Sequence, residues 1–360
     1  MIQGFRLPKG LDYIKLPCLN RGLEGELSAK YLGTSMEETV ELRSQLIYSA
    51  AFHFKPDLLL VDKKPAGLKG ELTETLDYLQ HYSPKTKRVL LLRDILDTPE
   101  KTIADWQKLG CYKDMQAHYD QVLVVGMQTI FDVAKEYQFP LPIAPKIRYC
   151  GYIRKQPGEH SRATLRQTLG IQATDRLVLV TPGGGEDGYE LVNTYLQGLK
   201  QAASNKAWYS LILCGPEMPG EQQLQLQQLA AICPRVTLHS FTDDLLSYLA
   251  AADAVVAMGG YNTLTEILTL GKRAVVVPRI KPSQEQLIRA TRLAERGLVR
   301  MLHPEYVTPR SLIQAVEAQL KARSSLPDGL DFNGLPRIAN HLATLLSPAQ
   351  EPSCPVYQLA

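Results

Sequence analysis

The sequence lacks the patterns that mark most metal sites, disulfide frameworks and membrane spans. Its six cysteines are scattered without a C-x-x-C pair, which indicates unpaired thiols in a reducing compartment. Its seven histidines form no H-E-x-x-H motif, and no Asp-x-Asp occurs, so we expect neither a metal site nor another cofactor. No apolar run reaches the ~18 residues that a membrane span needs, and the first residues lack the apolar core of a signal peptide. We therefore expect a cytoplasmic protein, for which peripheral contact with a membrane surface stays open.

The charge is also too small to indicate a polyanionic partner. A net charge of +3, with no block of Lys and Arg, predicts no binding to nucleic acid. With 360 residues the chain is long for one hydrophobic core and suits two domains. Nothing in the composition indicates an oligomeric state.

Short apolar runs alternate with helical patterns along the whole chain, which predicts parallel α/β sheets. Helices are expected between the runs, for instance over Met36–Phe54 and Leu72–His81. The first half holds five candidate strands: Asp12–Leu16, Asp57–Val61, Arg88–Leu92, Gln121–Val125 and Lys146–Tyr149. The second half holds six: Leu177–Val180, Tyr209–Leu213, Val236–Leu238, Ala254–Ala257, Ala274–Val277 and Val299–Leu302.

Glycines and a proline over Gly151–Gly158 interrupt this rhythm and predict a linker. We expect an acceptor-side domain over residues 1–151, a donor-binding domain over 152–340 and a tail over 341–360. Two doubly wound units would face each other across a cleft, and ligands of such sheets bind outside the carboxyl ends of the strands.

The strongest motif follows the candidate strand Ala254–Ala257. Two glycines, Gly259 and Gly260, precede a helix that we expect to begin at about Asn262. Such a turn lets a diphosphate approach the free N–H groups of the helix. Glu266, one turn later, would accept hydrogen bonds from ribose hydroxyls. Thr263-x-x-Glu266 also matches a capping box, which needs no ligand, and both explanations stand at this point.

Three further loops follow strands on the same side of the expected sheet. Arg279 follows the candidate strand Ala274–Val277, and Glu285 and Gln286 open the next helix. The alternative explanation for Glu285 and Gln286 is a solvent-exposed first helical turn that binds no ligand. Phe241, Thr242 and Leu245 follow another strand, although Asp243 could be there simply as a helix cap.

The third loop contains Gly183, Gly184 and Gly185 within a G-x-G-x-x-G pattern. A dinucleotide site would need an acidic residue at the tip of the next strand, about 20 positions on, and none is present there. We therefore favour contact with the phosphate or sugar of a donor over NAD binding.

Together these loops resemble the donor domain of GT-B glycosyltransferases over residues 241–298. The resemblance is greatest to the lipid-II-forming N-acetylglucosaminyltransferases of peptidoglycan synthesis and their bacterial relatives. It implies an α/β protein with two doubly wound Rossmann-like domains, which binds a UDP-sugar donor and an unknown acceptor. It also implies roles for the loop residues: uracil contacts from Phe241, Thr242 and Leu245, diphosphate contacts from Gly259, Gly260, Tyr261, Asn262 and Thr263, a ribose contact from Glu266, and sugar contacts from Glu285 and Gln286.

The first half resembles a bacterial group of predicted glycosyltransferases through Gly4–Pro8, Leu16-Pro17, Asp62–Gly67 and Leu92–Asp97. It opens without the first strand and Gly-rich loop that GT-B acceptor domains normally have, so we expect the first βα unit to be missing. Asp62, at a strand end, is the best remaining candidate for the base that takes the acceptor proton, although a plain turn aspartate is the commoner case.

The expected activity is metal-independent transfer of a hexose or N-acetylhexosamine from a UDP-sugar. Arg279 would help to stabilise the leaving diphosphate. Two alternatives stay open: a UDP-N-acetylglucosamine 2-epimerase, which would need histidines and carboxylates that the cleft loops have few of, and a non-catalytic subunit that binds a nucleotide sugar.

Overall fold

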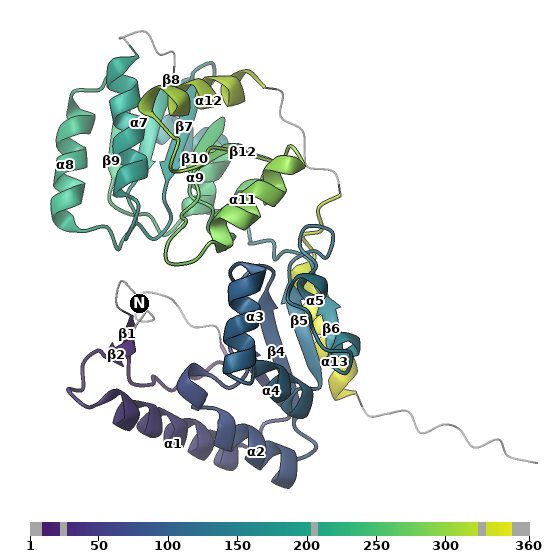
Figure 1. Cartoon of the computed structure of the whole chain (residues 1–360). Coiled ribbons are helices and arrows are strands. Elements are labelled where there is room, and N and C mark those ends of the chain that lie inside the picture. The colour runs from purple at the N-terminus through teal and green to yellow at the C-terminus, as the bar shows by residue number, and fades with distance from the viewer. Residues whose placement is uncertain (1–8, 22–26, 203–207, 323–328, 348–360) are drawn as a thin grey trace, which may run out of the picture.

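The computed structural model describes residues 9–21, 27–202, 208–322 and 329–347. Gly4–Pro8 and most of the expected tail lie outside these ranges. Figure 1 shows two α/β bodies, one above the other. None of the helices in the described ranges is both long and apolar enough to cross a membrane.

The lower body contains the first sheet, a parallel sheet in the order β3-β4-β5-β6. A short antiparallel hairpin, β1-β2, precedes it. Helix α1 begins with a complete capping box between Ser35 and Glu38. The elements of this body are β1 (Leu19–Arg21), β2 (Leu27–Ala29), α1 (Met36–Phe54), β3 (Leu58–Asp62), α2 (Thr73–Tyr82), β4 (Lys87–Arg93), α3 (Pro99–Lys108), α4 (Cys111–His118), β5 (Gln121–Val125), α5 (Val133–Glu136) and β6 (Ile147–Tyr149), with 3-10 turns at Leu68–Gly70 and Ala144–Lys146.

The upper body contains the second sheet, a parallel sheet in the order β12-β11-β10-β7-β8-β9. Its elements are α6 (Arg162–Thr168), β7 (Arg176–Thr181), α7 (Tyr189–Gln201), β8 (Trp208–Leu213), α8 (Gly220–Ala231), β9 (Val236–His239), α9 (Leu245–Ala251), β10 (Ala254–Ala257), α10 (Tyr261–Thr269), β11 (Arg273–Val276), α11 (Glu285–Glu295), β12 (Arg300–Met301) and α12 (Pro309–Lys321).

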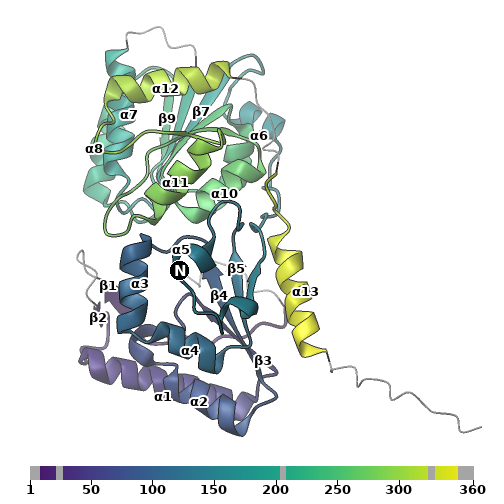
Figure 2. The ribbon, with the colours of Figure 1, turned by 45° about the vertical axis from the view of Figure 1, so that its right-hand side comes forward.

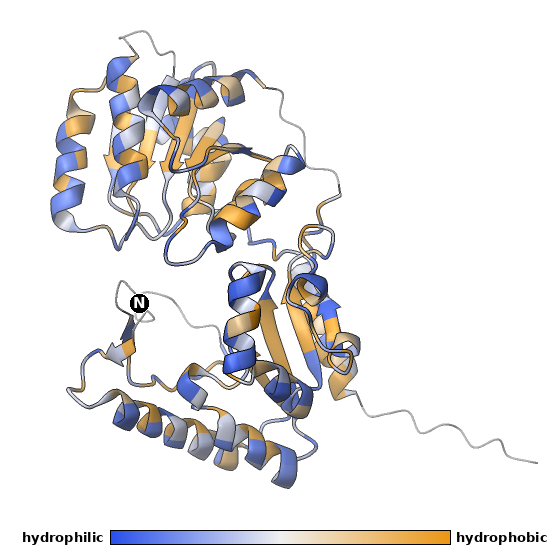
Figure 3. Ribbon diagram, in the orientation of Figure 1, coloured by the Kyte–Doolittle hydropathy of each residue, from blue (hydrophilic) through white to orange (hydrophobic). Residues whose placement is uncertain are grey.

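Both faces of the second sheet are covered by helices, and its central strands β7, β8, β10 and β11 are mostly apolar (Figure 3). Along β7, Leu177 and Leu179 join one buried cluster, while Val178 and Val180 join the cluster on the opposite face. The expected α/β fold with two parallel sheets is confirmed; the strand order reverses within the second sheet, whereas the described strands of the first sheet follow the order of the chain.

The last helix, α13 (Gly334–Leu346), returns to the first sheet, and Figure 2 shows it beside the lower body. Ile338, Leu342 and Leu345 lie on one face of α13 and pack with Val89 and Leu123 of β4 and β5. The tail expected from residue 341 is therefore wrong for 341–346, which are helical. We propose that α13 belongs to the N-terminal domain and that the domains divide near residue 151.

The chain thus crosses between the two bodies twice, and the two crossing segments are joined to each other. Tyr152 N–H donates to the Asp331 carbonyl at 2.8 Å, and Gly334 N–H donates to the Tyr152 carbonyl at 2.9 Å. Gly151 has a φ of +80°, and a Cβ there would lie 2.9 Å from the Asp331 carbonyl oxygen. Glycine is therefore required where the two segments meet.

One expected strand is absent from the structure. Asp12–Leu16 has no strand pairing and is largely exposed, and the first strand is instead β1 at Leu19–Arg21. A short run of mixed apolar residues does not form a strand without a neighbour to complete its hydrogen bonds.

Candidate functional site

The centre of the second sheet is the place where its strand order reverses. Strands β7 and β10 pair there, while β8-β9 and β11-β12 extend to either side. The loops after β7 and β10 diverge at this point, which is where doubly wound sheets bind their ligands. A Cβ on Gly183 would lie 3.7 Å from Oγ1 of Thr263, so the loop after β7 faces the first turn of α10.

Helix α10 begins at Tyr261 with Gly260 as its N-cap, and no side chain caps it. Thr263 therefore lies inside the first turn, and the capping box with Glu266 is not formed. The first N–H groups of a helix have no acceptor within it, so they remain at the positive end of the helix dipole. Asn262 is exposed at this end, as an anion site requires.

The two glycines before α10 differ in their surroundings. A Cβ on Gly259 would lie 2.8 Å from the Gln286 carbonyl oxygen, so α11 packs directly against this residue. A Cβ on Gly260 would meet no atom within 4 Å, and its φ of −60° suits any residue. Packing therefore explains Gly259, whereas Gly260 leaves open space beside the helix N-terminus.

Glu266 lies on α10 with only 5% of its surface exposed. Its Oε1 is paired with the ammonium of Lys155, a half-exposed linker residue. Its Oε2 is buried and has no hydrogen-bond partner among the described residues. A buried acceptor without a donor is costly, so this oxygen is suited to a ligand hydroxyl.

Gln286 holds the two loops on this side of the sheet together. Its Oε1 accepts hydrogen bonds from the N–H groups of Gly259 at 3.0 Å and Arg279 at 3.1 Å. Because both donors are backbone amides, the orientation of the side-chain amide is determined, and its NH₂ group is the end left for a ligand.

Arg279 and Glu285 are partly engaged with each other and with the loop after β7. The Arg279 guanidinium lies 3.1 Å from Asp187 Oδ2 and 3.8 Å from Glu285 Oε1. Arg279 also lines a pocket of about 460 Å³ with Asp187 and Lys281. Arg279 thus borders the site, but carboxylates already balance its charge.

The loop after β9 presents an aromatic ring to solvent. Phe241 is 54% exposed, which is unusual for phenylalanine and leaves its face free for a base. Thr242 Oγ1 accepts from the Asp244 N–H at 3.2 Å, and Leu245 is the first residue of α9. The expected cap at Asp243 is wrong, because Asp244 caps α9 by accepting from Ser247 N–H.

The glycine loop after β7 is packed against the next loop of the sheet. Gly185 has a φ of +95°, and a Cβ there would lie 2.4 Å from the Cys214 carbonyl oxygen. The Gly184 carbonyl accepts from Glu217 N–H at 2.9 Å, while Gly184 itself is exposed. Close packing explains Gly185, and Gly183 and Gly184 form the accessible part of the loop.

Asp62 lies at the carboxyl end of β3 and is exposed. Because β3 pairs only with β4 among the described strands, Asp62 is at the edge of the first sheet rather than at its centre. Its role as a base stays a prediction.

Three charged residues that the sequence patterns did not single out as site residues lie beside this site. Asp94 and Arg289 form a fully buried pair between the two bodies, at 3.2 Å. Lys155 pairs with Glu266 from the linker. Each contact joins segments far apart in the chain, so no local pattern could reveal it.

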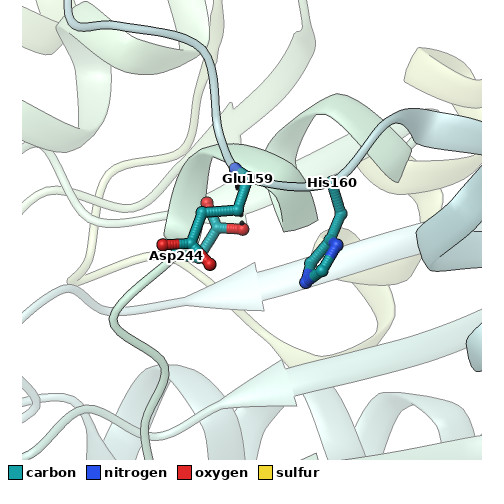
Figure 4. Close-up of side chains that lie close together, drawn as sticks. All are labelled: Glu159, His160 and Asp244. Carbon is teal, nitrogen blue, oxygen red and sulfur yellow. Dashed lines mark hydrogen bonds between the residues drawn. The ribbon is translucent and has the colours of Figure 1, made fainter.

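Figure 4 shows a small polar cluster of Glu159, His160 and Asp244, whose candidate ligand atoms all lie within 4.8 Å of one another. This is the nearest approach to a metal site among the described residues. Both carboxylate oxygens of Asp244 already accept backbone N–H groups, one from Ser247 and one from Glu159. Its plain role is to attach the linker to the start of α9.

Comparisons with known proteins support these observations. Residues 177–328 match the model of the glycosyltransferase family 28 C-terminal domain. An uncharacterized glycosyltransferase of Methanopyrus kandleri is 27% identical over 195 residues, which are 54% of this chain and 53% of that protein. The UDP-N-acetylglucosamine–N-acetylmuramyl-(pentapeptide) pyrophosphoryl-undecaprenol N-acetylglucosamine transferase of Acetivibrio thermocellus is 26% identical over 176 residues, covering 48% of this chain and 47% of that enzyme. The matched region thus spans about half the length of these curated relatives.

Solved structures show the same two-domain architecture. The glycosyltransferase of kitacinnamycin has a TM-score of 0.61 at 15% identity, covering 89% of this chain and 85% of that one. The UDP-GlcNAc 2-epimerase of Methanocaldococcus jannaschii has a TM-score of 0.59 at 12% identity, covering 88% and 86%. At these identities the likeness shows the fold alone. Residues 177–328 thus resemble the glycosyltransferase family 28 C-terminal domain, and the chain as a whole has the two-domain GT-B fold.

Proposed function

We propose that the protein is a glycosyltransferase that moves a hexose or N-acetylhexosamine from a UDP-sugar to an acceptor of unknown chemistry. One observation carries the proposal: the uncapped N-terminus of α10, open at Gly260, is followed one turn later by a buried carboxylate oxygen of Glu266 that has no hydrogen-bond partner among the described residues. A diphosphate and a ribose hydroxyl would satisfy both groups at once.

The arrangement suits departure of the diphosphate from the sugar. The bond between the sugar C1 and the diphosphate oxygen breaks, and negative charge develops on that oxygen in an oxocarbenium-like transition state. The free N–H groups at the start of α10 are fixed before the reaction, so they stabilise this charge at little cost of reorganisation. The NH₂ group of Gln286 would donate to a hydroxyl of the donor sugar.

The acceptor hydroxyl forms the new bond to C1 and must give up its proton. Asp62 is the proposed base, and its exposed position at the carboxyl end of β3 leaves it free to receive that proton. The aromatic face of Phe241 would support the uracil ring, with Thr242 and Leu245 beside it.

Epimerisation of a UDP-sugar is the second candidate, because solved epimerases share this fold with TM-scores like those of the transferases. The sequence relatives favour transfer, since they carry glycosyltransferase names. Incubation with UDP-N-acetylglucosamine alone separates the two: a C2 epimer appears only if the protein is an epimerase.

Calorimetry with UDP, UDP-sugars and NAD tests the donor site. We expect UDP to bind and NAD not to bind. Glu266→Gln should lower the affinity for UDP about 10- to 100-fold, because the substitution removes a charge-assisted hydrogen bond. Glu221→Gln, an exposed change in the first turn of α8, is the matched control and should leave UDP affinity unchanged.

Two results would overturn the assignment. One is binding of NAD, and the other is UDP affinity that Glu266→Gln leaves unchanged. If UDP binds but neither transfer to an acceptor nor epimerisation is observed, the third hypothesis is favoured: a non-catalytic subunit that binds a nucleotide sugar.

A further inference from the structure

Arg289 of α11 is a buried cation that the proposed reaction does not use. Only 2% of its side chain is exposed. Its Nη1 donates to the Gly259 carbonyl at 3.2 Å, at the turn before α10. Its Nη2 donates to Asp94 Oδ1 at 3.2 Å and to the Ile95 carbonyl at 3.3 Å, in the loop after β4. One guanidinium therefore bridges the turn of the second sheet and the first sheet.

Asp94 is held as firmly from its own side. It is completely buried, and its Oδ1 also accepts the Ile95 N–H at 2.8 Å. Its Oδ2 accepts from the Tyr152 hydroxyl at 3.3 Å, at the start of the linker. The carboxylate thus joins β4, the linker and α11 in one hydrogen-bonded group.

Two side chains of α11 hold the backbone of Gly259 in place. Gln286 accepts its N–H, and Arg289 donates to its carbonyl. The guanidinium is planar and rigid, so its two arms cannot follow separate movements of their partners. A displacement of the first body that moves Asp94 would therefore be transmitted to the Gly259 carbonyl, and with it to the first N–H groups of α10.

We propose that Asp94 and Arg289 are positioning residues that couple the anion-binding turn at Gly259–Thr263 to the N-terminal domain. The turn has its binding geometry only while the two domains are in contact through this pair. The identity of the ligand rests on the proposed function, whereas the coupling is a property of the free protein.

A second contact between the bodies provides the control. Arg292 lies on the same helix and pairs with Glu136 at 3.3 Å, but its side chain is 39% exposed and that of Glu136 30%. No described contact of either side chain reaches the turn. Glu136→Gln therefore weakens the domain contact while leaving the turn untouched.

Hydrogen–deuterium exchange on the ligand-free protein tests the coupling directly. We expect Asp94→Asn to speed exchange about tenfold or more at the two hydrogen-bonded amides that flank the turn, the Gly259 N–H bound to Gln286 and the Leu264 N–H bound to the Gly260 carbonyl, although the substitution lies in the other domain. Glu136→Gln should leave those amides unchanged. Since loss of one partner can unfold a protein with a buried pair, the double variant Asp94→Leu/Arg289→Met, which replaces the pair with apolar groups, should show the same local effect in a stable fold.

The proposal is overturned if exchange at the turn stays at the wild-type rate in the double variant. It is also overturned if every segment exchanges faster by the same factor, because that result would indicate general destabilisation.

Titration with UDP supplies the reciprocal measurement. Linkage requires that a ligand at the turn also acts on the other domain. UDP should slow exchange at residues 94–96 in the wild type and in Glu136→Gln but not in the double variant, whose UDP affinity should fall about tenfold. If UDP fails to bind the wild type, the proposed donor is wrong, and the ligand-free exchange still decides the coupling.

Discussion

Two neighbouring glycines, Gly259 and Gly260, occupy their positions for different physical reasons. In the sequence Gly259 and Gly260 form a single Gly-Gly turn. In the structure Gly259 is a point of close packing against Gln286, whereas Gly260 faces open space at the start of α10.

This contrast gives a paired prediction. Gly260→Ala should fold with an unchanged Tm, because its added methyl group meets no atom, but it should weaken UDP binding about tenfold by filling the space that the diphosphate needs. Gly259→Ala should lower the Tm by several degrees, because an overpacked contact costs about 1–3 kcal/mol.

Thermal unfolding and calorimetry on both variants measure the two effects. If Gly260→Ala binds UDP with wild-type affinity, the diphosphate does not bind at this turn. A Gly259→Ala variant of unchanged Tm would contradict the packing explanation.

At this scale the sequence predicted residues that sit at strand ends and missed those that act across the fold. Gly183, Gly260 and Glu266 follow strands or open a helix, so their grouping follows from the parallel sheet. Asp94 and Arg289 are 195 positions apart, and their contact depends on how two separately folded bodies meet.

At the scale of the elements, apolar runs predicted the central strands well because both faces of these strands are buried. Strands β5 and β10 have the bounds that their apolar runs predict, and α1 has the predicted bounds as well. The prediction of a strand at Asp12–Leu16 failed for a different reason: a short run forms a strand only where a neighbouring strand completes its hydrogen bonds, and the local sequence does not show whether such a neighbour exists.

The turn between α10 and β11 holds a half-buried lysine, Lys272, with a predicted effect on stability. Lys272 Nζ donates to the Ala250 and Ala252 carbonyls at the end of α9, at 2.7 and 2.9 Å. Burial, together with the positive charge of Arg162, lowers the pKa of Lys272 to about 8, while the charge of Asp253 acts in the opposite direction. Below that pH the folded protein carries a charge that its surroundings disfavour.

The unfolded chain keeps its proton to higher pH than the folded one, so folding becomes more favourable as pH rises from about 8 towards the ordinary lysine pKa. The Tm of the wild type minus that of Lys272→Met should therefore rise between pH 7 and pH 9.5, by the order of a degree or two. Lys200→Met, an exposed change on α7, is the control, and its difference should stay flat. A flat difference for Lys272→Met would show that the ammonium is not disfavoured there.

At the scale of the whole molecule, the position of α13 could not be read from the sequence. Its apolar stripe of Ile338, Leu342 and Leu345 predicts a buried face but does not say which sheet it covers. The structure places it on the first sheet, although it follows the second one in the chain.

Ending the chain after Asn333 should therefore destabilise the N-terminal domain and not the domain to which α13 is adjacent in sequence. The deletion uncovers Val89, Leu123 and Val125, and loss of such burial costs several kcal/mol. We expect a new unfolding transition at lower temperature in calorimetry, with increased exchange confined to β4 and β5.

A chain ending after Ser347 is the control, because it keeps all the described contacts of α13. If the chain that ends after Asn333 unfolds in one transition at the wild-type temperature, α13 does not contribute to the stability of the first domain.

The paired crossings between the bodies have a mechanical consequence. A single linker would let one domain swing, twist and translate against the other. Here two segments of the chain pass between the domains next to each other, and backbone hydrogen bonds among Tyr152, Asp331 and Gly334 join them. We expect this double connection to restrict relative motion of the domains mainly to opening and closing about one axis, with the Asp94–Arg289 contact stabilising the closed arrangement.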